Sequence, residues 1–183
     1  LRMGMSRRLS NLGLIALAAR EEPTVRAAVL CLQRTLHLHN EALGIVIEEA
    51  NGIAVFSGQV LARIDGPARQ AVELTVAVLF RCLRELLGPG WSPLAVCFTH
   101  APPRELAPYH NAFGQRVQFN SVLNGLTLRA HELERAMPHA DPQSLRTIRQ
   151  YLDASAGPQP TQAERCTRLI LGLLSTGRCS VEL

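Results

Sequence analysis

The stretch that decides the fold is Leu43–Val60, LGIVIEEANGIAVFSGQV, in which two runs rich in β-branched residues flank Asn51-Gly52. Asn-Gly is the strongest two-residue hairpin signal, because a type I′ turn needs a positive φ at both central positions. Ile45 and Ile47 share one face of the first run, since side chains alternate along a strand. The stretch therefore predicts an antiparallel hairpin with one apolar face.

Two helices are predicted before the hairpin. Ser10-Asn11 can cap a short helix over Leu12–Ala19, and Thr24 is a good N-cap for a stronger one. In the stronger helix, apolar residues recur at helical spacing up to Leu36, which indicates a buried face.

The elements predicted after the hairpin mix helices and strands without a regular βαβ alternation. They are a long helix from Gly66-Pro67 to Gly88, a strand over Leu94–His100, a helix from Pro102-Pro103 to Phe113, strands over Arg116–Phe119 and Gly125–Leu128, and a helix from Asp141-Pro142 to about Ala154. This order predicts an α+β fold with an antiparallel sheet packed against helices.

A break in composition divides the chain. Residues 156–160, AGPQP, are small, proline-rich and uncharged, which is typical of a linker. Beyond them, Thr161–Glu164 forms a capping box before an apolar helical stripe. We therefore expect a domain over residues 1–155, a linker over 156–160, and the start of a second domain over 161–183.

Composition excludes several classes of protein. The 183 residues are 47% hydrophobic and 19% charged, which excludes a disordered chain. The apolar run Ala71–Phe80 is short and is interrupted by Glu73 and Thr75, so no transmembrane span and no membrane partner are predicted. The net charge is +4, but the arginines are scattered and form no basic stripe.

Cysteines and histidines give no sign of a metal or disulfide framework. The cysteine count is odd and no CxxC pair occurs, which favours free thiols in a reducing cytosol. His37 and His39 are the only close histidine pair, and no Cys/His spacing of a metal site appears. We predict neither a metal nor a cofactor.

The sequence also lacks signatures of catalysis. It contains no GxSxG, P-loop or dinucleotide-binding GxGxxG motif. Cys97 and His100, three residues apart on a predicted strand, would face opposite sides of the sheet. No catalytic residue is predicted, and the chain is not expected to be an enzyme.

The stretch Gly88–His100, GPGWSPLAVCFTH, resembles a segment of the arabinose-binding-like N-terminal domain of AraC-type transcription regulators. Later markers follow in the order of that family, from Tyr109–Phe119 through Asn124–Leu128 to 133–142. Gln115-Arg116 departs from the family's usual Cys-Pro. Residues 169–182 resemble the first helix and turn of the same regulators' DNA-binding domain.

The resemblance implies a cytoplasmic bacterial regulator. Its N-terminal domain would bind a small-molecule effector and pair with a second copy, and its C-terminal domain would bind operator DNA through helix-turn-helix units. Since the second helix of such a unit reads the bases, and only the first is expected here, these 183 residues are not expected to bind operator DNA specifically. A ligand-independent dimerisation module is the alternative.

Candidate effector contacts follow from the expected cavity between sheet and helices, where small-molecule sites are often built. Core packing is the alternative role for the aromatic residues among them. An arginine can grip a carboxylate with two hydrogen bonds, which suggests a polar anchor. The expected lining residues are Phe56, Thr75, Phe98 and Tyr109, and the expected anchors are Arg34, His37 and Arg81.

Overall fold

The computed structural model describes residues 1–61 and 68–155 together with residues 163, 167 and 170. Its elements are, in chain order, α1 (Arg2–Ser6), η1 (Leu9–Leu12), α2 (Leu14–Arg20), α3 (Val25–Thr35), η2 (Leu36–Leu38), β1 (Leu43–Ala50), β2 (Ile53–Val60), α4 (Arg69–Leu87), β3 (Ala95–Cys97), α5 (Ala107–Phe113), β4 (Val117–Gln118), β5 (Gly125–Arg129), η3 (Ala130–Glu134) and α6 (Pro142–Ser155). The predicted linker and most of residues 161–183 lie outside the described part.

The predicted hairpin is confirmed. β1 and β2 pair in antiparallel register from Leu43 opposite Val60 to Ala50 opposite Ile53. Asn51 and Gly52 have φ values of 52° and 76°, as a type I′ turn requires. The pairing of β1 with β2 therefore follows from the conformation of the turn between them.

The sheet has five strands in the order β1-β2-β5-β3-β4. Three of its pairings are antiparallel, but β3 and β4 run parallel, with Val96 opposite Val117. The predicted α+β fold with an antiparallel sheet packed against helices is confirmed, and the pairing of β3 with β4 adds a parallel edge that the sequence did not indicate. Two parallel strands need a crossover connection between them. Here that connection contains α5, which lies between β3 and β4 in the chain.

The helices before the hairpin are partly as predicted. Thr24 is the N-cap of α3, and its hydroxyl oxygen accepts a hydrogen bond from the backbone N–H of Ala27 at 3.2 Å. Ser10 and Asn11 instead belong to η1, where the Asn11 side chain accepts a hydrogen bond from the backbone of Arg8. They therefore precede α2 and do not cap it.

Other predicted boundaries differ from the structure, since α5 begins at Ala107 and not at Pro102-Pro103. The start of the long helix at Gly66-Pro67 lies outside the described residues, and α4 is described from Arg69. β3 spans only Ala95–Cys97 of the strand predicted over Leu94–His100. Its short length matches the two-residue partner β4, although the Phe98 N–H still donates to Gln118 O at 2.9 Å.

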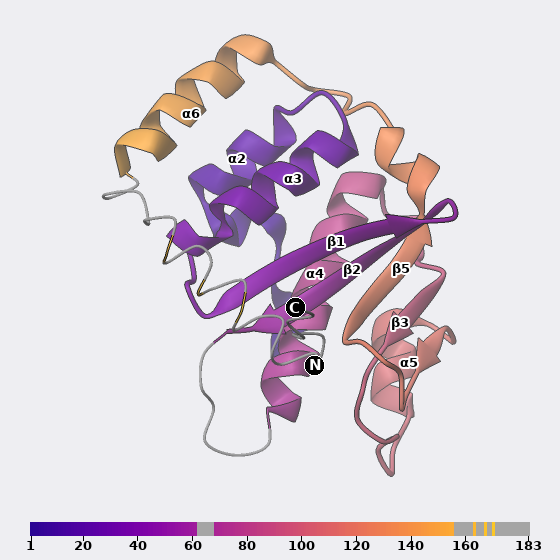
Figure 1. Cartoon of the computed structure of the whole chain (residues 1–183). Helices are drawn as coiled ribbons and strands as arrows, with labels where there is room; N and C mark the ends of the chain where they lie inside the picture. Colours follow the sequence, from indigo (N-terminus) through magenta and orange to yellow (C-terminus); the bar gives the residue numbers. More distant parts are fainter. Residues whose placement is uncertain (62–67, 156–162, 164–166, 168–169, 171–183) are drawn as a thin grey trace, which may run out of the picture.

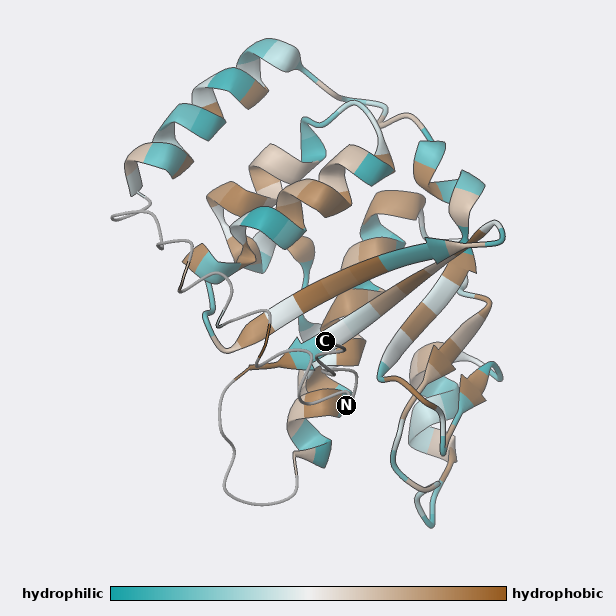
Figure 2. Cartoon of the chain, in the orientation of Figure 1, coloured by the Kyte–Doolittle hydropathy of each residue, from teal (hydrophilic) through white to brown (hydrophobic). Residues whose placement is uncertain are grey.

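The elements form layers (Figure 1). α4 packs against β2 and β5, α3 packs against α2, and α6 lies on α2, on the side away from the sheet. α6 is mostly hydrophilic, whereas apolar residues gather on α4 and the strands (Figure 2). The described helices include none that is both long and apolar enough to cross a membrane. The core thus lies between the sheet and the helices.

Candidate functional site

A cavity of about 60 Å³ lies between the sheet and the helices. We call it the interlayer cavity. α3 and η2 form one wall, α4 a second, and the hairpin a third. Its lining residues are Leu12, Val29, Leu32, Leu36, Leu43, Gly44, Ile45, Gly58, Thr75, Val78, Leu79, Cys82, Leu83 and Leu86. Because these walls come from separate parts of the chain, a molecule in the cavity would contact several elements at once.

The lining is apolar except for Thr75 and the weakly polar Cys82. The Thr75 hydroxyl donates to the backbone oxygen of Ala71, one turn earlier in α4, at 2.8 Å. Burial raises the pKa of the Cys82 thiol to about 12, so this thiol is uncharged at neutral pH. The described residues of the interlayer cavity therefore present hydrocarbon and no charge.

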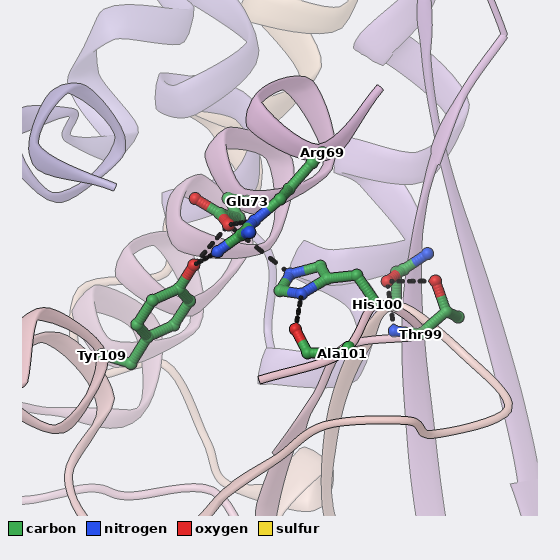
Figure 3. Close-up of polar contacts among 7 residues, drawn as sticks. Arg69, Glu73, Thr99, His100, Ala101 and Tyr109 are labelled. Atoms are coloured by element: carbon green, nitrogen blue, oxygen red, sulfur yellow. Dashed lines mark hydrogen bonds and ion pairs between the residues drawn. The ribbon is translucent and has the colours of Figure 1, made fainter. Parts of the chain in front are cut away.

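A second, smaller group of side chains joins α4 to α5 (Figure 3). We call Arg69, Glu73, His100 and Tyr109 the polar cluster. Glu73 Oε1 accepts a hydrogen bond from the Tyr109 hydroxyl and another from Arg69 Nε, the latter at 2.7 Å. His100 Nε2 lies 3.5 Å from the same oxygen, and its Nδ1 lies 2.8 Å from Ala101 O.

Electrostatic interactions explain why Glu73 is ionised in the polar cluster. Burial raises the pKa of the Glu73 carboxyl, but hydrogen bonds from Tyr109 and Arg69 and the positive charge of Arg69 outweigh burial, so the pKa lies below its usual 4.5. Burial and the neighbouring Glu73 raise the pKa of Tyr109. At neutral pH an ionised Glu73 thus fastens the start of α4 to α5.

Aromatic rings surround the polar cluster on the sheet side. Phe98 is fully buried and packs edge-to-face on Tyr109, with ring centroids 5.7 Å apart. It also stacks on Phe119 at 5.8 Å and approaches Phe113 at 5.9 Å. Phe98 and Tyr109 therefore belong to the packing of α5 on the sheet, and neither lines the interlayer cavity.

The other predicted contacts lie apart from one another. Thr75 alone of the seven lines the interlayer cavity, while Phe56 lines a separate pocket between α3 and β1. Arg34 is exposed on α3, and His37 is half-buried in η2. Arg81 of α4 donates to the backbone oxygen of Arg7 at 3.4 Å. The structure does not bring the seven residues together.

The pocket beside Phe56 is crossed by an ion-pair network. Arg26 of α3 forms two hydrogen bonds with Glu49 of β1, and its Nε donates to Glu134 Oε1 at 2.7 Å. These carboxylates raise the pKa of Arg26. Because protein carboxylates already pair with the Arg26 guanidinium, this pocket leaves a ligand fewer groups to bind than the interlayer cavity does.

Sequence reasoning missed Arg69, Glu73 and His100. One signal was available for Glu73, because it interrupts the apolar run Ala71–Phe80 on the side of α4 that faces α5. A carboxylate at a buried helix position needs a partner, but the sequence does not say which of its arginines or tyrosines supplies it.

Comparisons with known proteins agree with this architecture. The model of the arabinose-binding domain at the N-terminus of AraC transcription regulators matches residues 1–137. The HTH-type transcriptional regulator VirS from two strains of Mycobacterium tuberculosis is 30% identical over 185 aligned positions, which cover 100% of this chain and 54% of VirS. The chain thus spans about half the length of these relatives.

A solved structure shows the same fold. The crystal structure of the transcriptional regulator CdpR from Pseudomonas aeruginosa superposes with a TM-score of 0.64, at 18% sequence identity, over 98% of this chain and 60% of that one. The arrangement of sheet and helices is therefore shared with a regulator of distant sequence.

Proposed function

The chain belongs to the AraC family of transcription regulators, through their arabinose-binding N-terminal domain, and on that premise we propose that it is a regulatory domain that binds a small-molecule effector in the interlayer cavity. The observation that carries the proposal is the position of this cavity, between α3, α4 and the hairpin. Clefts between layers of secondary structure are where small-molecule sites are commonly built.

We further propose how the domain fits into the whole regulator. Residues 1–155 would form the regulatory domain, 156–160 the linker, and 161–183 the start of a helix-turn-helix domain that binds operator DNA in the bacterial cytoplasm. VirS, which carries HTH-type in its name, is aligned over 54% of its length, and this supports the proposed order of domains. The effector can shift the DNA-binding half only by as much as its affinity differs between two arrangements.

The proposal includes a homodimer and excludes catalysis. α2 exposes Leu14 and Leu17, which are 44% and 46% exposed and lie on one face three residues apart. A second copy covering them would remove apolar surface from water. The absence of catalytic motifs from the sequence supports a binding role and not turnover.

Among the predicted effector contacts, we propose that Thr75 contributes to the cavity wall with Leu79 and Leu83. Arg34, His37 and Arg81 stay predictions of a polar anchor outside the cavity, and Phe56, Phe98 and Tyr109 stay predictions of further contacts. Calorimetric titration of an effector into Arg34→Ala and Arg81→Ala variants tests the anchors.

Filling the cavity tests the function. Cys82→Phe places a ring in the interlayer cavity, whereas Val122→Phe adds the same ring at a position that is 88% exposed. In the full-length regulator, we expect Cys82→Phe to keep operator binding but lose the response to effector in a transcription assay. Val122→Phe should respond like the wild type.

The effector itself is sought by a thermal-shift screen of small acids, amino acids and lipids. A ligand at 100 times its Kd stabilises the folded domain by about 2.7 kcal/mol, which raises Tm. If every effector found this way stabilises Cys82→Phe as much as the wild type, the interlayer cavity is not the site.

A further inference from the structure

The chemistry of the cavity wall limits what can bind there. Among the lining residues that the structure describes, the only hydroxyl is that of Thr75, and it already donates to Ala71 O within α4. Its methyl group faces the hairpin, because a Cβ atom added at Gly58 would lie 2.6 Å from Thr75 Cγ2. Thr75 therefore shows hydrocarbon to the cavity, although its residue type is polar.

The strand backbone in the lining is engaged as well. The carbonyl oxygen of Ile45 accepts a hydrogen bond from Gln33 Nε2 at 3.0 Å. The N–H of Gly58 donates to Asn124 O at 3.1 Å, toward β5. Glycine at position 58 thus lets α4 approach the sheet without offering a donor to the cavity.

Resting on the effector-binding function proposed above, we propose that the group seated in the interlayer cavity is an aliphatic hydrocarbon, and that a sugar is excluded from it. A pentose carries several hydroxyl groups, and each would lose its water without gaining a partner in this lining. The name of the domain family refers to arabinose, so the proposal sets this chain apart from that description.

The volume sets the size of the group. Engineered apolar cavities of roughly 150 Å³ bind benzene or xenon. At about 60 Å³, the interlayer cavity has room for a short alkyl group. A longer chain would have to separate α3 or α4 from the hairpin, which would couple occupancy to the positions of these elements.

Methyl NMR of the protein tests the class of ligand with three probes. Xenon represents any small apolar molecule, hexanoate represents an amphiphile with an alkyl end, and L-arabinose represents a sugar. We expect xenon and hexanoate to give saturable shifts of the Val78, Leu79 and Leu83 methyl signals. L-arabinose should leave these signals unchanged.

Variants of the cavity wall show where hexanoate binds. Thr75→Val removes the hydroxyl but keeps the shape, so hexanoate should bind with its affinity changed less than twofold. Cys82→Phe should weaken hexanoate at least tenfold. Val78→Leu fills the cavity more gently and replaces Cys82→Phe if that variant does not fold.

The outcomes separate this inference from the proposed function. Saturable arabinose shifts at the lining methyls, weakened in Thr75→Val, would overturn the hydrocarbon class while supporting an effector site in the cavity. Lack of response to both xenon and hexanoate in the folded wild type would overturn the inference directly. If Cys82→Phe and Val78→Leu bind hexanoate as tightly as the wild type, the apolar site lies elsewhere, and the proposed location fails too.

Discussion

Among the glycines that the structure describes, Gly125 has the least room for a side chain. It lies in β5 between Ser57 of β2 and Cys97 of β3, and a Cβ atom there would lie 1.9 Å from Phe56 O. The obstacle is backbone in the middle of the sheet, which cannot rotate away as a side chain can. The identity of this residue is therefore set by the close approach of two strands.

We expect Gly125→Ala to destabilise the fold by about 3 kcal/mol or more, since it overpacks a rigid part of the core. Gly90→Ala is the matched control, because a Cβ atom at Gly90 meets nothing within 4 Å. Urea denaturation of the two variants measures the difference. Equal midpoints would show that β2 and β5 can separate at little cost.

Single residues of the site were only partly predictable. Thr75 was predicted as an effector contact from its place on the apolar stripe of a long helix; it lines the interlayer cavity, and its contact with an effector stays a prediction. The sequence does not reveal which way its hydroxyl points, because that depends on the hydrogen bond to Ala71 O. Contacts such as Glu73 with Tyr109 join residues 36 positions apart, and local patterns carry no information on them.

Among the elements, α6 is held to the rest of the domain by few contacts. Leu145 and Leu152 are its buried residues. At its middle, Arg149 NH2 donates to Glu22 Oε1 at 2.6 Å, and the Glu22 side chain is only 4% exposed. Before its first turn, the Asp141 N–H donates to Glu21 Oε2 at 2.9 Å. The α2–α3 turn therefore positions both the start and the middle of α6.

Removing the positive charge of Arg149 tests whether its ion pair holds α6 to the rest of the domain. Arg149→Met leaves the Glu22 carboxylate buried without its partner, which we expect to cost about 1–3 kcal/mol of stability. Hydrogen exchange of the α6 amides should speed up more than that of α3 or α4. Arg146→Met, at an exposed position of the same helix, should leave both quantities unchanged.

Adding Glu22→Gln to Arg149→Met should restore part of the lost stability, because a neutral amide costs less to bury than a carboxylate. If the double variant is no more stable than Arg149→Met, the ion pair is not what holds α6.

Elements that depend on residues close together in the sequence were predicted well. The pairing between strands that are far apart in the sequence was not. The hairpin and the start of α3 depend on Asn51-Gly52 and on Thr24, which act within a few residues. The parallel pairing of β3 with β4 depends on where α5 returns the chain. That return is a tertiary outcome, so no pattern in either strand indicates its direction.

At the scale of the whole molecule, the proposed homodimer can be tested on α2. If a second copy covers Leu14 and Leu17, Leu14→Glu with Leu17→Glu should shift the sedimentation-velocity profile from dimer toward monomer. Val122→Glu changes an equally apolar but separate position and should leave the dimer intact. A dimer that persists in the Leu14/Leu17 double variant would place the interface elsewhere.

The fold class was predictable because the order of helices and strands suffices for it, whereas the cavity was not. The interlayer cavity arises where α3, α4 and the hairpin leave a gap, and its size depends on side-chain packing across 14 residues. A single sequence states which faces are apolar but not how completely they fill the space between them.

The interlayer cavity also affects how the domain responds to hydrostatic pressure. Space that no atom occupies is lost when the chain unfolds, so unfolding shrinks the system and hydrostatic pressure promotes it. The interlayer cavity is such a space, at the joint between helices and sheet. A molecule that fills the cavity should therefore raise the pressure at which the domain unfolds.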